Sequence, residues 1–138
     1  QRQMCIRDRV DGVTVARSMG QDPECVFKTL VARGASKALY VFDIPVGDTL
    51  DLKKAARAVG EKSIAMLPQK ELLSNTGYVH GGCSPVGMKK QYPTVFHETA
   101  ELFDTICVSA GKIGAQVEVA PADLIALLGA QTADVTAE

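Results

Sequence analysis

The stretch from Ala38 to Gly60, ALYVFDIPVGDTLDLKKAARAVG, contains the two clearest secondary-structure signals in the chain. Its first part, Ala38–Ile44, is apolar at nearly every position, which is typical of a strand buried on both faces. Its second part, Asp51–Val59, places apolar residues on one side of a helix and basic residues on the other, and Gly60 ends that helix. A buried strand followed by an amphipathic helix predicts a sheet with helices packed against it.

The segments on both sides of this stretch continue the mixture of strands and helices. The sequence predicts strands at Val26–Ala32, Ser63–Leu67, Thr94–Phe96, Thr105–Ser109 and Gln116–Val119. It predicts helices at Pro68–Asn75 and Pro121–Leu128, a helical turn near Glu98–Leu102, and a short helical stripe of Val13, Val15, Ala16 and Met19. Because these elements alternate irregularly, the pattern favours an α+β fold with a mixed sheet over a doubly wound Rossmann sheet.

The length and composition indicate a single globular domain. The chain has 138 residues, and no apolar run approaches the ~18 residues that a membrane span needs. The net charge of −1 and the aromatic content of 5% argue against a strongly basic nucleic-acid binder with broad base-stacking platforms. A local basic face is still compatible with this charge. Its candidate residues, which could equally be ordinary solvated side chains, are Lys53, Lys54, Arg57, Lys89, Lys90 and Lys112.

The N-terminal residues 1–10 (QRQMCIRDRV) differ in character from the rest of the chain. They contain three arginines and no apolar signal core, so we expect a disordered or non-native leader at 1–10 and one domain over 11–138. The four cysteines form no CxxC pair and the two histidines lack zinc spacing, so we expect no metal site. Free thiols in a reducing cytoplasm are the simplest interpretation of this cysteine usage.

The common catalytic motifs are absent from the sequence. There is no GxSxG elbow, P-loop, GxGxxG or HExxH motif, and therefore no self-evident nucleophile and base. Three local features could still bind a ligand. The glycine-rich loop Gly81–Gly87 (GGCSPVG) could direct backbone N–H groups at a carboxylate or oxyanion, or it could be a plain surface turn. Lys28 could line a cleft or point to solvent, and Ser109–Lys112 (SAGK) could contact a ligand or form a tight hairpin corner.

One cysteine lies within these candidate segments. Cys83 is in the glycine loop three residues after His80, so a Cys–His hydrolase is one hypothesis. A small residue that fills a loop is the commoner explanation of such a cysteine, since nothing in the sequence indicates an ionised thiol. We expect His97 to be structural, and Cys25 and Cys107 to lie in or near the core.

Four blocks, taken in order, resemble the YbaK/EbsC family. They are Phe27–Leu30 (FKTL), Leu50–Ala56 (LDLKKAA), Thr76–Gly87 (TGYVHGGCSPVG) and Val108–Lys112 (VSAGK). The branch that they resemble most comprises the Cys-tRNA(Pro)/Cys-tRNA(Cys) deacylases, and the family is also similar to the editing insertion domain of bacterial prolyl-tRNA synthetases. The resemblance extends from about Gly12 to Val135.

This resemblance implies a fold, an activity and a site. The fold would be a mixed sheet curved into a partial barrel with flanking helices, and the activity would be trans-editing, the removal of a wrong amino acid from tRNA. Lys28 matches the family's essential lysine. The aminoacyl group and tRNA end would contact Thr29, Gly81, Gly82, Ser84, Pro85, Gly87, Ser109 and Gly111. The partners would be mischarged tRNA and prolyl-tRNA synthetase, and no cofactor is implied.

The resemblance also implies a mechanism without a protein nucleophile. In the cysteine-specific branch the thiol of the substrate attacks its own ester and leaves as a cyclic thiolactone. Three departures bear on this inference. The helix and strand that usually precede the Gly12 region are not recognisable, Cys83 replaces an aliphatic residue, and Gln116 stands where an acidic residue is frequent. An alanine- or serine-specific editor, a binding module without turnover and a Cys83-dependent hydrolase are the alternatives.

Overall fold

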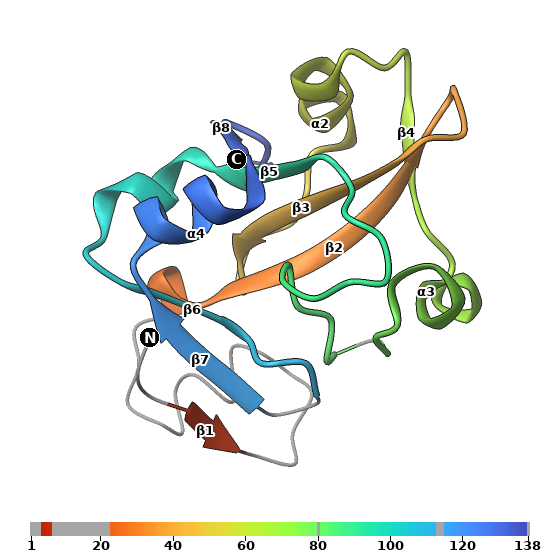
Figure 1. Ribbon diagram of the computed structural model, residues 1–138. Coiled ribbons are helices and arrows are strands. Elements are labelled where there is room, and N and C mark those ends of the chain that lie inside the picture. The colour runs from red at the N-terminus through yellow and green to blue at the C-terminus, as the bar shows by residue number, and fades with distance from the viewer. Residues whose placement is uncertain (1–3, 7–22, 80, 113–114, 138) are drawn as a thin grey trace.

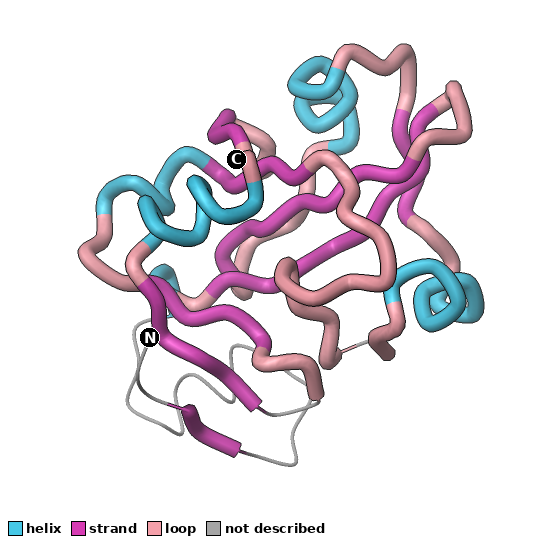
Figure 2. The backbone as a smooth tube through the Cα atoms, in the orientation of Figure 1, coloured by secondary structure: helices cyan, strands magenta, loops and turns pink. Residues whose placement is uncertain are grey.

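The computed structural model describes residues 4–6, 23–79, 81–112 and 115–137. These residues form two sheets, which are not closed into a barrel, with helices on their faces (Figures 1 and 2). The larger sheet has the order β4-β2-β3-β5-β8. Its strands are β2 (Phe27–Gly34), β3 (Leu39–Pro45), β4 (Ile64–Met66), β5 (Thr94–His97) and β8 (Gln131–Ala133).

The pairing directions within this sheet are mixed, as the sequence predicted. Strand β2 is antiparallel to β3 and β4, whereas β3 is parallel to β5, and β5 is parallel to β8. The longest ladder joins β2 to β3 in seven pairs, from Phe27 opposite Pro45 to Arg33 opposite Leu39. The β2–β3 hairpin is therefore the centre of the fold.

A three-stranded sheet, in the order β1-β7-β6, lies beside the start of β2. Its strands are β1 (Met4–Ile6), β6 (Ile106–Ser109) and β7 (Ala115–Val119), all antiparallel to their neighbours. A parallel bridge between Val26 and Cys107 connects it to the larger sheet. Strand β6 is adjacent to the beginning of β2 and β4 is paired with its end, so the middle of β2 lies between them (Figure 1).

The helices cover both faces of the central hairpin. Helix α2 (Leu52–Val59) packs on one face, over a core that includes Ala32, Phe42 and Ile44. The opposite face is covered by α3 (Gln69–Thr76) and the loop that follows it, over Val31 and Val41, and by the layer of β6 and α4 (Pro121–Leu128) around Phe27 and Phe96 (Figure 1). The short 3-10 helices η1 and η2 are Pro23–Cys25 and Glu98–Leu102.

Local chemistry explains the boundaries of α2. The carboxylate of Asp51 accepts hydrogen bonds from the backbone N–H groups of Lys53 and Lys54, at 2.9 and 3.0 Å, and so caps the helix N-terminus. Gly60 ends the helix with a φ of 78°, a left-handed conformation that favours glycine. The sequence predicted the end of this helix at Gly60 correctly, and it placed the beginning one residue early, at Asp51.

Most predicted elements agree with the structure, and three segments need comment. Strand β8 was not predicted because its sequence, Gln-Thr-Ala, has no apolar alternation, and it pairs through its backbone with β5. Residues 4–6, within the predicted leader, form β1 and pair with β7. The helical stripe predicted at 13–19 lies outside the described residues. Among the residues described, no helix is long and apolar enough to cross a membrane.

Candidate functional site

The side chain of Tyr78 brings two of the predicted ligand-binding segments together. Its hydroxyl donates a 2.5 Å hydrogen bond to the carbonyl oxygen of Val86 in the glycine-rich loop. A Cβ atom built on Gly87 would lie 2.9 Å from this hydroxyl, and one built on Gly111 would lie 3.2 Å from the Tyr78 ring. The loop 81–87 and the turn after β6 therefore meet across one tyrosine, at positions where both glycines have positive φ. The sequence placed Tyr78 in a motif but did not indicate this role.

Hydrogen bonds within the loop already use two of its N–H groups. The N–H of Gly82 donates to the carbonyl of Val79 at 3.0 Å, and the N–H of Val86 donates to the hydroxyl of Ser84 at 3.2 Å. These two groups are consequently not available as oxyanion donors in this conformation. Ser84 and Pro85 are buried, whereas Gly81 and Gly87 are exposed, so the loop is anchored by its middle and open at its ends.

The sheet register places Lys28 beside Ser109. Two residues beyond the parallel bridge of Val26 to Cys107 come Lys28 on β2 and Ser109 at the end of β6. Because strand side chains alternate, these two share the face of Val26 and Cys107. Gln116 of β7 is paired with Ser109 and extends the same row. Lys28, Ser109 and Gln116 thus lie side by side on one face of three neighbouring strands, and we call them the Lys28 row.

The environment of Lys28 suits a group that binds anions. Its side chain is half-buried, and this burial lowers the pKa of the Lys28 ammonium, while the nearby carboxylate of Asp48 acts in the opposite direction. A partly desolvated cation attracts a phosphate or a developing oxyanion more strongly than a fully hydrated one. Gln116 is buried, and its Oε1 accepts no hydrogen bond from any described residue.

Thr29 points to the other face of β2, where it contacts a buried acid. Its hydroxyl donates a 2.5 Å hydrogen bond to Oδ1 of Asp43, the residue opposite it on β3. Asp43 is fully buried, and desolvation raises the pKa of its carboxyl to about 7, although the Thr29 hydrogen bond opposes this shift. The sequence did not single out Asp43, because one aspartate in an apolar strand gives no sign of its partner.

Cys83 lies against this acid and not in the Lys28 row. Burial raises the pKa of its thiol to about 12, and the charge of Asp43 adds to the effect, while a hydrogen bond with Thr76 opposes it. The thiol therefore keeps its proton at neutral pH, which disfavours the nucleophile hypothesis. His80 lies outside the described residues. His97 is buried and its Nδ1 accepts a 3.2 Å hydrogen bond from the N–H of Val135, as expected of a structural histidine.

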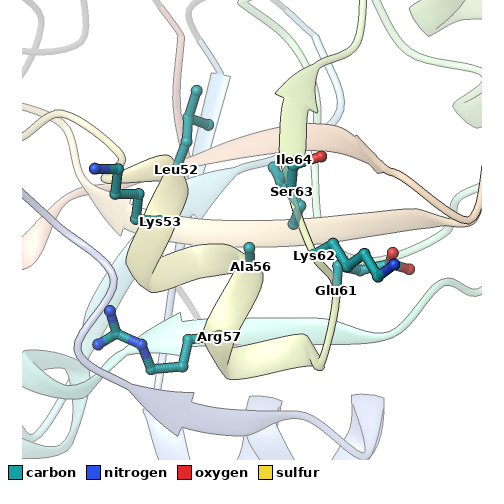
Figure 3. Close-up of a pocket in the computed structure, with 8 residues that line it drawn as sticks. All are labelled: Leu52, Lys53, Ala56, Arg57, Glu61, Lys62, Ser63 and Ile64. Carbon is teal, nitrogen blue, oxygen red and sulfur yellow. The ribbon is translucent and has the colours of Figure 1, made fainter.

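A separate, open pocket of about 560 Å³ lies between α2 and β4 (Figure 3). Its lining residues are Leu52, Lys53, Ala56, Arg57, Glu61, Lys62, Ser63 and Ile64. Lys53 and Arg57 project from the same side of α2, and Ala56 faces the segment from Glu61 to Ile64 (Figure 3). Three cations against one carboxylate make this surface basic.

No group of three or more His, Cys, Asp or Glu side chains among the described residues could hold a metal ion.

Of the basic residues predicted to form one face, several have other contacts. Lys54 forms a 3.0 Å salt bridge with Asp134 and donates to the carbonyl of Thr136, so it ties α2 to the C-terminal segment. Lys90 lies over the ring of Tyr92, 5.8 Å from its centroid.

The buried acid gives a pH-dependent stability that can be measured. The pKa of Asp43 is about 7 in the folded protein and close to its ordinary 3.8 when unfolded. Its stabilising contribution is therefore complete below pH 3.8 and is lost as the pH rises to 7, a change that corresponds to about 4 kcal/mol. Compared with wild type by urea denaturation, Asp43→Asn should become relatively more stable from pH 5 to pH 8. A difference that stays constant over this range would contradict the raised pKa.

Comparisons with known proteins match this chain to a family. The family model described as the aminoacyl-tRNA editing domain matches residues 10–127. A protein of Enterococcus faecalis named "Putative Cys-tRNA(Pro)/Cys-tRNA(Cys) deacylase EbsC" is 46% identical over 129 residues, which cover 94% of this chain and 79% of that protein. The uncharacterized protein YwhH of Bacillus subtilis is 26% identical over 110 residues, or 79% of this chain and 69% of its own length.

The solved structures agree with the sequence comparisons. One described as a "putative trans-editing enzyme for prolyl tRNA synthetase" superposes with a TM-score of 0.87 at 27% identity, covering 99% of this chain and 87% of that one. The predicted fold class and the predicted class of enzyme, an aminoacyl-tRNA deacylase, are thus confirmed. The chain belongs to the aminoacyl-tRNA editing domain family.

Proposed function

We propose that this protein removes a wrongly attached amino acid, cysteine in the first instance, from tRNA(Pro). The observation that carries the proposal is the row of Lys28, Ser109 and Gln116 at the beginning of β2, beside β6, whose following turn meets the glycine loop at Tyr78. A half-buried cation beside small and neutral polar groups suits a charged tRNA end with a small aminoacyl group. The relative named as a Cys-tRNA(Pro) deacylase supports the same substrate.

The proposed reaction uses the thiol of the substrate. Its sulfur attacks the ester carbonyl carbon, a sulfur–carbon bond forms, and the bond between that carbon and the ribose oxygen breaks. The thiol proton ends on the ribose hydroxyl, and cysteine leaves as a four-membered thiolactone. The protein then needs to supply only position and charge. The protonated, buried Cys83 fits this scheme, since no side chain of the protein has to act as nucleophile.

Each site residue has a role in this proposal. Lys28 binds the terminal phosphate or stabilises the oxyanion that develops on the ester. Ser109 and Gln116 contact the aminoacyl group, while Gly87 and Gly111 leave room for Tyr78 to close the pocket wall. The remaining predicted contacts in the loop are Gly81, Gly82, Ser84 and Pro85, whereas the Thr29 hydroxyl is turned to the other face of β2 and bonded to Asp43.

The basic pocket beside α2 is a suitable contact for the tRNA backbone. Ile64, which lines it, pairs with Gly34 at the far end of β2 from Lys28. Gly34 is six residue steps along β2 from Lys28, or about 20 Å, and α2 covers the same sheet face to which Lys28 belongs. A tRNA whose 3′ end lies at Lys28 could place acceptor-stem phosphates near Lys53 and Arg57. Their attraction would add affinity to a chain of nearly neutral net charge.

A synthetase partner would supply further affinity. The resemblance to a trans-editing enzyme for prolyl-tRNA synthetase supports that synthetase as the partner, and an aminoacyl-tRNA substrate would place the reaction in the cytoplasm. Alanine or serine remains the alternative amino acid, since pockets distinguish side chains that differ by one methylene by only ~1–3 kcal/mol.

Lys28→Met is expected to slow release of labelled cysteine from Cys-tRNA(Pro) by about 100-fold or more, because it removes the cation from the reacting ester. Lys70→Met, on the exposed surface of α3, is the matched control and should keep the wild-type rate. Wild-type release together with unchanged release by Lys28→Met would remove Lys28 from the mechanism. If wild type binds the charged tRNA without any release, the protein is a binding module.

Gly87→Ala should slow deacylation by about tenfold, because its Cβ would displace the Tyr78 hydroxyl from a position only 2.9 Å away. Gly60→Ala provides a close control, since Gly60 has the same φ of 78° and nothing within 4 Å. Both variants should lose roughly 1 kcal/mol of stability from backbone strain. Equal rates for the two variants would show that the Tyr78 contact does not shape the site.

The double variant Lys53→Gln, Arg57→Gln tests the tRNA contact. It should weaken binding of tRNA(Pro) and reduce the slope of log affinity against log salt by about 1 to 2, as expected for the loss of two phosphate contacts. The rate with a short aminoacylated trinucleotide should not change, since that substrate does not reach α2. A salt slope equal to that of wild type would exclude this pocket from the tRNA interface, and Lys70→Gln, which removes one positive charge from the exposed surface of α3, serves as the surface control.

A further inference from the structure

The interior beneath the glycine loop contains a group for which the proposed reaction has no use. Asp43 is completely buried in the centre of β3, with its Oδ1 bonded to the Thr29 hydroxyl and its Oδ2 without a hydrogen-bond partner among the described residues. Buried carboxyl groups are costly and are normally fully bonded. A half-bonded acid in the central hairpin therefore requires an explanation.

The position of Asp43 links the strand of Lys28 to the loop. Thr29 directly follows Lys28 on β2, and it is bonded across the ladder to Asp43. The thiol of Cys83, a residue of the loop, lies close enough to Asp43 for the charge of its carboxylate to raise the pKa of the thiol. Cys83 also packs on Val31 and Val41, the next residues along the same sheet face. One carboxyl group is thus hydrogen-bonded to the residue that follows Lys28 and interacts electrostatically with a thiol of the glycine loop.

We propose that Asp43 is a positioning residue that acts through Thr29, fixing the β2 segment at Lys28 against the glycine loop. This inference rests on the proposed deacylation. A carboxylate can only accept hydrogen bonds, so it holds the Thr29 hydroxyl in a single orientation. A protonated carboxyl can itself donate, and the orientation of Thr29 is then no longer determined.

The other groups that face Asp43 are uncharged, so its bonding to Thr29 depends on whether Asp43 itself is protonated. They are Thr29 on β2, Cys83 in the loop and Thr76 at the end of α3, next to Cys83. Phe96, its pairing partner on β5, is apolar. The charged pair Lys28 and Asp48 belongs with the opposite face of β2. Desolvation raises the pKa of Asp43 to about 7. Asp43 therefore gains and loses its proton in the neutral pH range in which the enzyme would work.

The first experiment is a pH profile of cysteine release by wild type and Asp43→Asn. Asparagine has the shape of the protonated acid, so the two rates should be similar near pH 5.5. The ratio of wild type to variant should rise to about tenfold by pH 8. Titration of the substrate affects both proteins equally and cancels in the ratio. A ratio that does not change with pH would overturn the proposal, since a merely structural residue would give that result.

A double-mutant cycle tests whether Asp43 acts through Thr29. Thr29→Val should lose the same factor at pH 8, and Asp43→Asn should add nothing in the Thr29→Val background. Independent, multiplying effects would show that Asp43 acts by another route. If the Asp43→Asn variant fails to fold, Thr29→Val alone still tests the pH profile, because the titration of Asp43 should then no longer change the rate.

An NMR titration tests the positioning role of Asp43 without a measurement of catalytic turnover. The Thr29 methyl signal and the amide signals of the loop should shift with a common midpoint near the pKa of Asp43 in wild type, and not in Asp43→Asn. Absence of this coupling would contradict the positioning role even if the protein has no deacylase activity. Coupling without cysteine release would preserve the positioning role and refute only the proposed function.

Discussion

The β2–β3 ladder is the interaction on which the remaining structure depends. Seven residue pairs join these strands, and their two faces are covered by different layers, α2 on one side and α3, the glycine loop and the β6 layer on the other. Because strand side chains alternate, neighbouring residues on β2 serve different layers. Lys28 lies on the face of α2 and Ser109, and Thr29 lies on the face of Asp43 and Cys83.

The candidate site lies where the strand next to β2 changes from β6 to β4. Strand β6 approaches its beginning and β4 pairs with its end, so the middle of the strand is not enclosed by either. The turn after β6 and the loop 81–87 converge there through Tyr78, and both use glycines at positive φ to allow the contact. This arrangement supplies a cation and small polar groups but no activated thiol, since Cys83 is buried and protonated. Positioning of a self-reactive substrate is the chemistry that such a site can support.

The sequence predicted the fold well where side-chain pattern alone determines structure. The apolar run of β3, the amphipathic α2 that Gly60 ends and the mixed sheet were all predicted correctly. Strand β8 was missed because its sequence has no apolar alternation. It forms by pairing with β5 and by hydrogen bonds of Gln131 and Thr132 to distant residues. The loop, Lys28 and Ser109 were named from a resemblance. Their spatial relations, the Tyr78 bridge and the role of Asp43 depend on contacts between distant segments, which no local pattern encodes.

The most direct test of the central claim concerns the substrate and not the protein. Wild-type protein would be given Cys-tRNA(Pro) and the same tRNA with its cysteine sulfur methylated, and release of the amino acid would be followed for both. The methyl group adds little volume but removes the attacking thiol. If the protein only positions a self-reactive ester, the thiol substrate is cleaved and the methylated one is stable. Comparable cleavage of both would show that the protein activates a nucleophile of its own or a water molecule.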